Sequence, residues 1–94
     1  MVIRQEDNEK GGSFYIGEHA DRLAELTYTW KDKDILVIEH TEVSDALGGK
    51  GIGKQLVKRA VEFAKEKKAK MLVLCPFAKK VIDNEPELRD VLKD

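Results

Sequence analysis

The sequence predicts an α+β fold, in which an antiparallel meander of about four strands joins a parallel βαβ unit with two or three helices. Residues 23–30 alternate between two faces, which is the period of a β-strand. Residues 35–38 are apolar on both faces, so this strand is expected inside the sheet. Apolar residues then recur at helical spacing over residues 52–68, and a short apolar strand follows at residues 71–74. This order implies a right-handed crossover between parallel strands.

The remaining elements are short. The central strand continues to residue 43, where its side chains become polar, and a loop follows over residues 44–51. A proline at position 76 suits the first turn of a second helix over residues 77–84. The other expected elements are an edge strand at 2–5, a strand at 13–17, a hairpin turn at 31–34 and a last short helix at 87–93.

The composition is that of an ordinary soluble globular protein. Of 94 residues, 41% are hydrophobic and 37% are charged, and we expect a single domain over residues 1–94. No apolar run approaches the roughly 20 residues needed to cross a bilayer. The first residues lack the basic start and apolar core of a secretion signal. With one cysteine there is no intramolecular disulfide and no all-cysteine metal site, so we expect no metal and a reducing cytoplasm.

The net charge of −1 hides an asymmetry along the chain. Residues 1–49 hold five Lys or Arg against eleven Asp or Glu, which gives −6. Residues 50–70, the basic block, hold eight Lys or Arg against two Glu, which gives +6. Residues 71–94 hold four Lys or Arg against five Asp or Glu, which gives −1. The basic block is either a solvated helix face or an anion-binding surface. Because the acidic first half opposes binding of DNA or RNA, no nucleic acid partner is expected.

Residues 48–54, with the sequence GGKGIGK, hold four of the seven glycines and lie between the central strand and the long helix. Glycines let backbone N–H groups approach a ligand closely, and the start of a helix adds a partial positive charge. Lys50 and Lys54 lie among these glycines. Such a segment is suited to hold an anion, most often a phosphate. A glycine-rich loop with no ligand is the alternative.

Two common nucleotide motifs fit this segment poorly. A P-loop pattern is matched from Gly48 to Lys54, but Gln55 stands where the magnesium-binding Ser or Thr belongs. The dinucleotide pattern G-x-G-x-x-G fails, because Lys54 or Leu56 occupies its last glycine position. A third pattern, Gly-x-Gly-x-Gly over residues 49–53, precedes a helix that is apolar from its first turn.

This third pattern resembles the acetyl-CoA pyrophosphate loop of the GCN5-related N-acetyltransferases (GNAT), Arg/Gln-x-x-Gly-x-Gly/Ala. Gly51 and Gly53 take the glycine positions, whereas Gly48 stands at the Arg/Gln position. That departure removes a side-chain donor and leaves the backbone donors in place. The segments HTEV at residues 40–43, CPFAK at 75–79 and PELRDVL at 86–92 resemble the small YjdJ-type branch of this superfamily. The resemblance extends from about residue 13 to the C-terminus.

The resemblance implies a GNAT-like fold that binds acetyl-CoA or coenzyme A, with the pantetheine arm between two parallel strands that splay apart. It implies backbone contacts from Val43 and its neighbours to the pantetheine, and a wrap of residues 49–54 around the pyrophosphate. Phe77 either packs on the cofactor or seats the second helix. Independently, the charge pattern makes Lys50 and Lys54 the best phosphate-binding side chains, with Lys58 one turn further on. The expected cofactor-binding residues are Glu42, Val43, Gly49, Lys50, Gly51, Ile52, Gly53, Lys54 and Phe77.

Two routes of acetyl transfer are compatible with the sequence. In the first, His40 acts as general base for direct attack by an amine. Strand alternation would place His40 on the same face as Leu36, Ile38 and Glu42. In the second, Cys75 takes the acetyl group first, with His40 as its base. The alternatives are non-catalytic roles, in which His40 is partly buried and bonded to a backbone carbonyl and Cys75 is a small buried hydrophobic residue.

The function predicted from these residues is acetyl-CoA-dependent N-acetylation of an unidentified amine. Only residues 6–12 separate the first two predicted strands, where full-length members of the family place the helices that build the acceptor groove. The acceptor side should therefore be shallow and open, so that it takes a protein or peptide amine or needs a partner. We expect a monomer and no membrane partner. The alternative is a non-catalytic coenzyme A-binding or partner-binding module.

Overall fold

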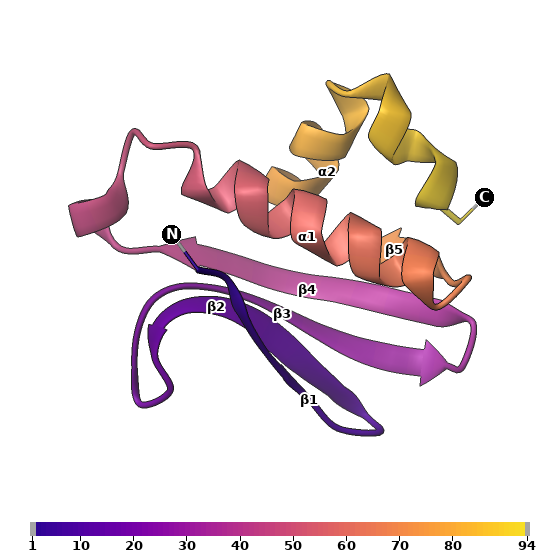
Figure 1. Ribbon diagram of the computed structural model, residues 1–94. Helices are drawn as coiled ribbons and strands as arrows, with labels where there is room; N and C mark the ends of the chain where they lie inside the picture. The colour runs from indigo at the N-terminus through magenta and orange to yellow at the C-terminus, as the bar shows by residue number, and fades with distance from the viewer. Residues whose placement is uncertain (1, 94) are drawn as a thin grey trace.

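A computed structural model of the chain describes residues 2–93 (Figure 1). It contains a five-stranded sheet whose strands follow one another in chain order. The first four strands are antiparallel, and the fifth is parallel to the fourth, which confirms the predicted meander and βαβ unit. The strands are β1 (Arg4–Asp7), β2 (Gly11–Glu18), β3 (Asp21–Asp32), β4 (Ile35–Val43) and β5 (Lys70–Val73).

β2 and β3 are longer than the hydrophobic pattern predicted, and β1 lies two residues later than the strand predicted at 2–5, whereas β4 has the predicted bounds. β3 covers 12 residues, because its backbone pairing continues into polar residues at both ends. The turn between β1 and β2 is short, and the Asn8 side chain accepts hydrogen bonds from the backbone N–H groups of Lys10 and Gly11 at 2.8 and 3.0 Å. No helix is therefore inserted between these two strands.

The helical elements agree with the sequence pattern except at the C-terminal end. The predicted helix at residues 52–68 and the one at residues 77–84 are both present. The predicted helix at residues 87–93 is instead a 3-10 segment, because the chain turns back to pair with β5 and Lys93 N donates to Met71 O at 2.9 Å. The elements are η1 (Asp45–Leu47), α1 (Ile52–Glu66), α2 (Pro76–Asp83) and η2 (Pro86–Val91).

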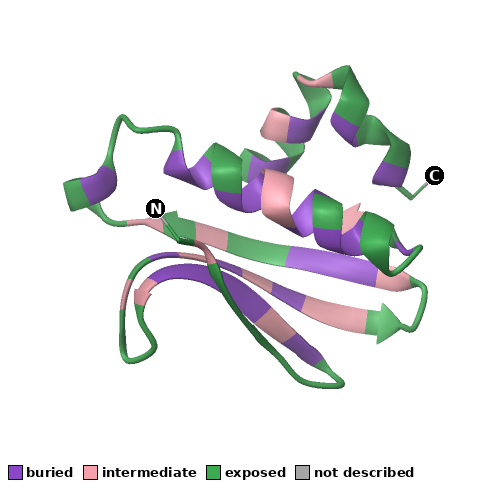
Figure 2. Cartoon of the chain, in the orientation of Figure 1, coloured by how far each residue is buried: buried purple, intermediate pink, exposed green. Residues whose placement is uncertain are grey.

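Both α-helices lie on one side of the sheet, and the core lies between them and the strands (Figures 1 and 2). Phe63 of α1 is central in this core. Its ring centroid lies 5.6 Å from those of Phe14 and Tyr28 and 5.8 Å from that of Trp30. The buried Tyr28 hydroxyl donates a hydrogen bond to Asp7 and so ties β1 to the sheet. The opposite face of the sheet carries no helix among residues 2–93.

A β-bulge at Glu39 reverses the alternation of β4. Thr27 and Tyr28 are neighbours on β3, yet they pair with His40 and Ile38, which are two positions apart. One extra residue on β4 therefore opposes β3 at this point, and every side chain after it changes face.

The bulge corrects the predicted placement of His40. Leu36 and Ile38 are fully buried on the helix side, and alternation alone would have placed His40 with them. Beyond the bulge, Thr41 and Val43 face the helices, whereas His40 and Glu42 lie on the face without helices, which we call the open face. His40 is thus an exposed side chain on the open face.

Candidate functional site

The sheet opens at the C-terminal ends of β4 and β5. Their pairing reaches only Ile38 and Val73, and Leu74 N adds a last hydrogen bond to Ile38 O at 2.9 Å. β4 continues to Val43 with no strand on its β5 side among the described residues. Strand pairing that stops short in this way leaves room for a ligand at the carboxyl ends of the strands.

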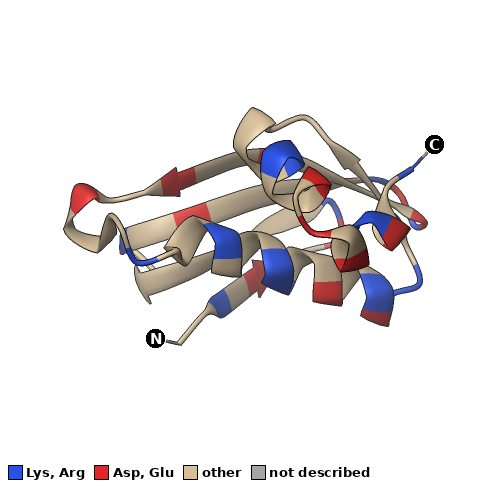
Figure 3. Ribbon diagram, turned by 90° about the horizontal axis from the view of Figure 1, so that it is seen from above, with Lys and Arg blue, Asp and Glu red and all other residues tan. Residues whose placement is uncertain are grey.

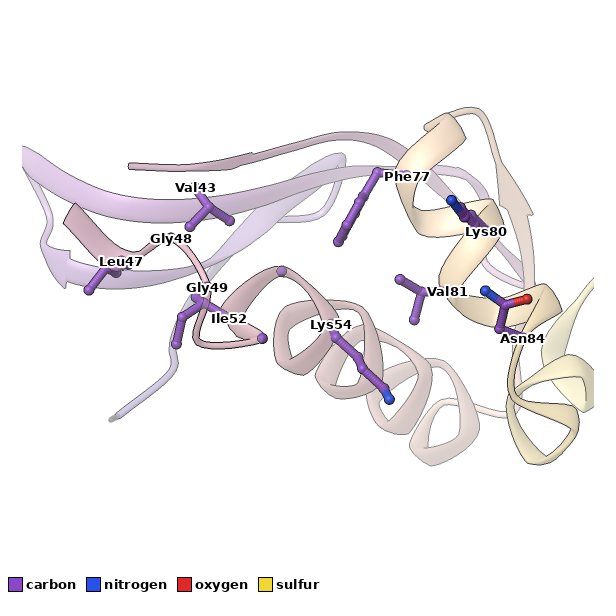
Figure 4. Close-up of a pocket in the computed structure, with 12 residues that line it drawn as sticks. Val43, Leu47, Gly48, Gly49, Ile52, Lys54, Phe77, Lys80, Val81 and Asn84 are labelled. Carbon is purple, nitrogen blue, oxygen red and sulfur yellow. The ribbon is translucent and has the colours of Figure 1, made fainter. Parts of the chain in front are cut away.

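A groove of about 490 Å³ lies at this opening. The end of β4, the glycine-rich segment, the start of α1 and one side of α2 form its walls (Figure 4). Apolar side chains and glycine backbone dominate the lining, with one lysine each from α1 and α2. The lining residues are Val43, Leu47, Gly48, Gly49, Gly51, Ile52, Gly53, Lys54, Phe77, Lys80, Val81 and Asn84.

Two glycines hold the chain in a conformation that other residues rarely adopt. Gly49 has φ +78° and Gly51 has φ +69°, and an added Cβ on either would meet no atom within 4 Å. Packing therefore does not explain these glycines, whereas the left-handed backbone does. The open space beside them is where a ligand could approach the backbone.

The start of α1 supplies unused backbone donors to this space. Gly51 is the N-cap and offers no side chain, and the first helical bond runs from Gln55 N to Gly51 O at 3.1 Å. The N–H groups of residues 52–54 therefore precede the hydrogen-bond ladder of the helix. Free amides at the positive end of a helix dipole fit a phosphate group.

Gly53 is required for another reason, which is the approach of α2. A Cβ on Gly53 would lie 2.7 Å from Cζ and 2.8 Å from Cε2 of Phe77. Phe77 therefore seats the start of α2 on the first turn of α1. Phe77 is still 45% exposed and lines the groove, so contact with a cofactor stays a prediction.

Figure 3 shows Lys and Arg positions along α1, which belongs to the basic block of residues 50–70. The lysines of this block differ in their ion-pair partners. Lys54 Nζ lies 2.8 Å from Glu85 Oε1, and Lys58 Nζ lies 3.5 Å from Glu85 Oε2. The hydrogen bond from Lys54 lowers the pKa of Glu85, and the same bond raises the pKa of Lys54. Lys50 is exposed and makes no ion pair with another described residue.

Cys75 and His40 lie in different surroundings. Cys75, the N-cap of α2, is only 6% exposed, and its Sγ donates a weak hydrogen bond to Thr41 Oγ1 at 3.6 Å. His40 Nε2 lies 2.8 Å from Glu42 Oε1 on the open face. No hydrogen bond joins His40 to Cys75 within the described part of the chain. The residue of β4 that contacts Cys75 is Thr41.

A second cavity of about 460 Å³ lies near the same end of β4. Glu25 and Glu42 are a cross-strand pair in its wall, and Arg22 Nη1 donates to Glu25 Oε2 at 2.6 Å. Val43 lines both cavities, so the end of β4 borders each of them. The lining residues are Arg22, Leu23, Ala24, Glu25, Glu42, Val43 and Ser44.

Seven of the nine expected cofactor-binding residues line the groove. Glu42 lines the second cavity instead, and Lys50 lines neither cavity. Sequence reasoning missed the contribution of α2, from which Lys80, Val81 and Asn84 face the groove (Figure 4). These residues are three, four and seven positions after Phe77, and this helical spacing could have found them.

Two kinds of feature are absent from residues 2–93. No group of three or more His, Cys, Asp or Glu side chains is placed to hold a metal ion. None of the described helices has the length and apolar character needed to cross a membrane.

Residues 13–91 match the sequence model of the GCN5-related N-acetyltransferase family. Similar proteins include Protein NATD1 of Homo sapiens, 38% identical over 87 residues, which cover 89% of this chain and 75% of that protein. Protein NATD1 of Xenopus tropicalis is 37% identical over 87 residues, with 89% of this chain and 78% of the relative covered.

Solved structures agree with this family. The NMR structure of a GCN5-like protein from Staphylococcus aureus is 42% identical and superposes with a TM-score of 0.78, covering 98% of this chain and 87% of that one. Tetrahymena GCN5 superposes with a TM-score of 0.63 over 93% of this chain and 63% of that one. At 13% identity this second likeness shows the fold alone. The chain belongs to the GCN5-related N-acetyltransferase family, whose acetyltransferases generally use acetyl-CoA.

Proposed function

We propose that this protein is an acetyl-CoA-dependent N-acetyltransferase that binds coenzyme A in the groove of Figure 4 and receives an acceptor amine from the open face. One observation carries the proposal. The groove combines left-handed glycines, open space and unused helix N–H groups at the point where the pairing of β4 and β5 ends. The glycine backbone and the helix N–H groups fit an anion, and the apolar part of the groove lining fits a long, weakly polar arm.

The proposed orientation of coenzyme A follows the polarity of the groove. Its pyrophosphate would accept hydrogen bonds from the backbone of residues 49–54, with Lys50 and Lys54 supplying positive charge. Its pantetheine arm would lie against Val43 and Phe77, so that the thioester reaches the opening between β4 and β5. Lys80 and Asn84 from α2 would contact the outer part of the cofactor.

In the proposed reaction, the nitrogen of a neutral amine attacks the carbonyl carbon of the acetyl thioester. The new C–N bond forms, the C–S bond breaks, and the proton lost by the amine ends on the departing thiolate of coenzyme A. We propose His40 as the base that receives this proton first. Its exposed imidazole lies on the open face, with Nε2 2.8 Å from Glu42 Oε1.

The second route uses an acetyl-Cys75 intermediate. Cys75 Sγ would attack the thioester, release coenzyme A as a thiol and form a new thioester, which the amine would then cleave. The burial of Cys75 and the absence of a contact with His40 favour direct attack over this route. The position of Cys75 at a helix start is nevertheless typical of reactive cysteines, so the two routes need separate tests.

We propose a protein or peptide amine as the acceptor. The wall of the second cavity carries Glu25 and Glu42, and none of its lining residues belongs to α1 or α2. Carboxylates attract a protonated amine, and an open surface leaves room for a chain on either side of it. Because Val43 lines both cavities, an amine held here would lie close to the thioester.

The experiment combines turnover with binding. The protein is incubated with acetyl-CoA and peptides that offer either a free N-terminus or a lysine, while free coenzyme A and acetylated peptide are measured by mass spectrometry. Coenzyme A is titrated separately by calorimetry. Equal, enzyme-dependent amounts of the two products support the proposal. Binding without transfer to any amine supports the non-catalytic module, and no binding contradicts both.

A further inference from the structure

The ion pair at Glu85 lies beside the proposed phosphate site. Glu85 is the N-cap of η2, and its side chain is 18% exposed, although Lys54 and Lys58 are half-exposed. Its Oε1 lies 2.8 Å from Lys54 Nζ. Its Oε2 is buried, accepts no hydrogen bond from another described residue and lies 3.5 Å from Lys58 Nζ.

The Glu85 carboxylate therefore forms ion pairs with two of the three lysines expected to attract the anion, Lys50, Lys54 and Lys58. Lys54 is also in the wall of the groove, one residue after Gly53. A phosphate that recruits Lys54 must replace Glu85 as its partner or be repelled by the carboxylate nearby. The carboxylate group resembles a phosphate in charge and in its acceptor oxygens, so it is suited to hold the lysine before the ligand arrives.

We propose that Glu85 is an internal competitor for the phosphate of coenzyme A, which holds Lys54 in the free protein and gives it up when the cofactor binds. Glu85 thereby sets the affinity of the groove for its anion. This inference rests on the proposed function of the groove. It assigns a role in ligand affinity to a residue that lies outside the groove and 31 positions after Lys54 in the sequence.

If Glu85 competes with the phosphate for Lys54, removing its charge should increase the affinity for coenzyme A. In Glu85→Gln, Lys54 is free and one negative charge is gone, so coenzyme A should bind about three- to tenfold more tightly at low salt. The gain should shrink in high salt, because added ions screen exposed charges. Glu62→Gln makes the same change of charge on an exposed part of α1, where Glu62 lies 3.9 Å from Arg59, and should leave the affinity unchanged.

A double-mutant cycle identifies Lys54 as the partner through which Glu85 acts. Lys54→Gln should weaken coenzyme A binding only slightly in the wild-type protein, because Lys54 is already neutralised by Glu85. The same substitution should weaken binding more strongly in Glu85→Gln. A merely structural role for Glu85 would instead lower the unfolding temperature and leave the affinity equal or weaker.

The test is calorimetric titration of coenzyme A into these variants, with the Glu85 side-chain carboxyl ¹³C signal followed by NMR in the wild-type protein. Tighter binding of Glu85→Gln alone, with a ligand-dependent shift of the Glu85 signal, is expected. Equal affinities in wild type, Glu85→Gln and Glu62→Gln overturn the inference and leave the proposed function standing. If Glu85→Gln does not fold, an unchanged Glu85 signal at saturating coenzyme A overturns it. Failure of the wild type to bind contradicts the proposed function as well.

Discussion

Replacing Gly53 by alanine tests the contact that joins the start of α1 to α2. The new Cβ would lie 2.7 Å from the Phe77 ring, so the ring or the helix start must move. Such overpacking destabilises by about 1–3 kcal/mol. Because Phe77 is 45% exposed, its ring is confined by protein on one side only, and we expect the lower end of this range, about 1–2 kcal/mol.

Alanine also has an intrinsic advantage over glycine in a helix, about 0.5–1 kcal/mol. In the wild-type background, Gly53→Ala should therefore lower the free energy of unfolding by about 1 kcal/mol. In a Phe77→Ala background no ring opposes the Cβ, so the same substitution should raise the free energy of unfolding by about 0.5 kcal/mol. The expected effect changes sign between the two backgrounds.

Urea unfolding followed by circular dichroism measures all four proteins of this cycle. Gly51→Ala is the matched control, because its Cβ would meet no atom within 4 Å and its φ of +69° alone makes alanine unfavourable. It should destabilise by about 1–2 kcal/mol in both backgrounds. If Gly53→Ala has the same effect with and without Phe77, the proposed seating of α2 is wrong.

Three further predictions concern the site and the core. The double variant Lys50→Glu/Lys54→Glu should weaken coenzyme A binding at least about tenfold at low salt. The control Lys31→Glu/Lys33→Glu makes the same change of net charge away from the groove and should leave the affinity unchanged. An equal loss of affinity in both double variants would show that only the net charge of the protein matters. If the amine attacks the thioester directly, His40→Gln should lower turnover by about 100-fold or more, whereas Cys75→Ala should keep its turnover. An inactive Cys75→Ala variant, together with an acetylated Cys75 in mass spectrometry of the wild type, would instead favour the acetyl-Cys75 route. Burial, followed by the hydrogen bond to Asp7, raises the pKa of Tyr28 in the folded state. The buried Tyr28 hydroxyl therefore contributes its full stability below about pH 10, the usual tyrosine pKa, and this contribution is lost as the pH rises further. Above about pH 10, the difference in free energy of unfolding between wild type and Tyr28→Phe should become smaller. Urea unfolding at a series of pH values measures it.

The elements could be predicted because their patterns are local. The alternation of residues 23–30, the apolar run at 35–38 and the helical spacing after residue 52 each depend on neighbours in the sequence. The glycine-rich segment could be recognised in the same way, since its four glycines lie within seven residues where the long helix begins. These local signals were enough for the strand order, the two α-helices and seven of the twelve residues that line the groove.

The features that sequence reasoning missed depend on contacts between distant segments. The bulge at Glu39 exists only in the register of β4 against β3, so counting along β4 placed His40 on the wrong face. The partner of Lys54 is Glu85, which no local pattern connects to it. The last segment forms a 3-10 turn because its end pairs with β5, and this pairing outweighs the helical pattern of residues 87–93.

The central claim is that coenzyme A binds along the glycine-rich segment and the neighbouring side of α2. Titration of acetyl-CoA into ¹⁵N-labelled protein, followed by amide NMR, tests it most directly. We predict shifts concentrated at residues 43–54 and at Phe77, Lys80 and Asn84, with little change on β1 and β2. Unchanged amide signals over residues 43–54 at saturating acetyl-CoA would contradict the account.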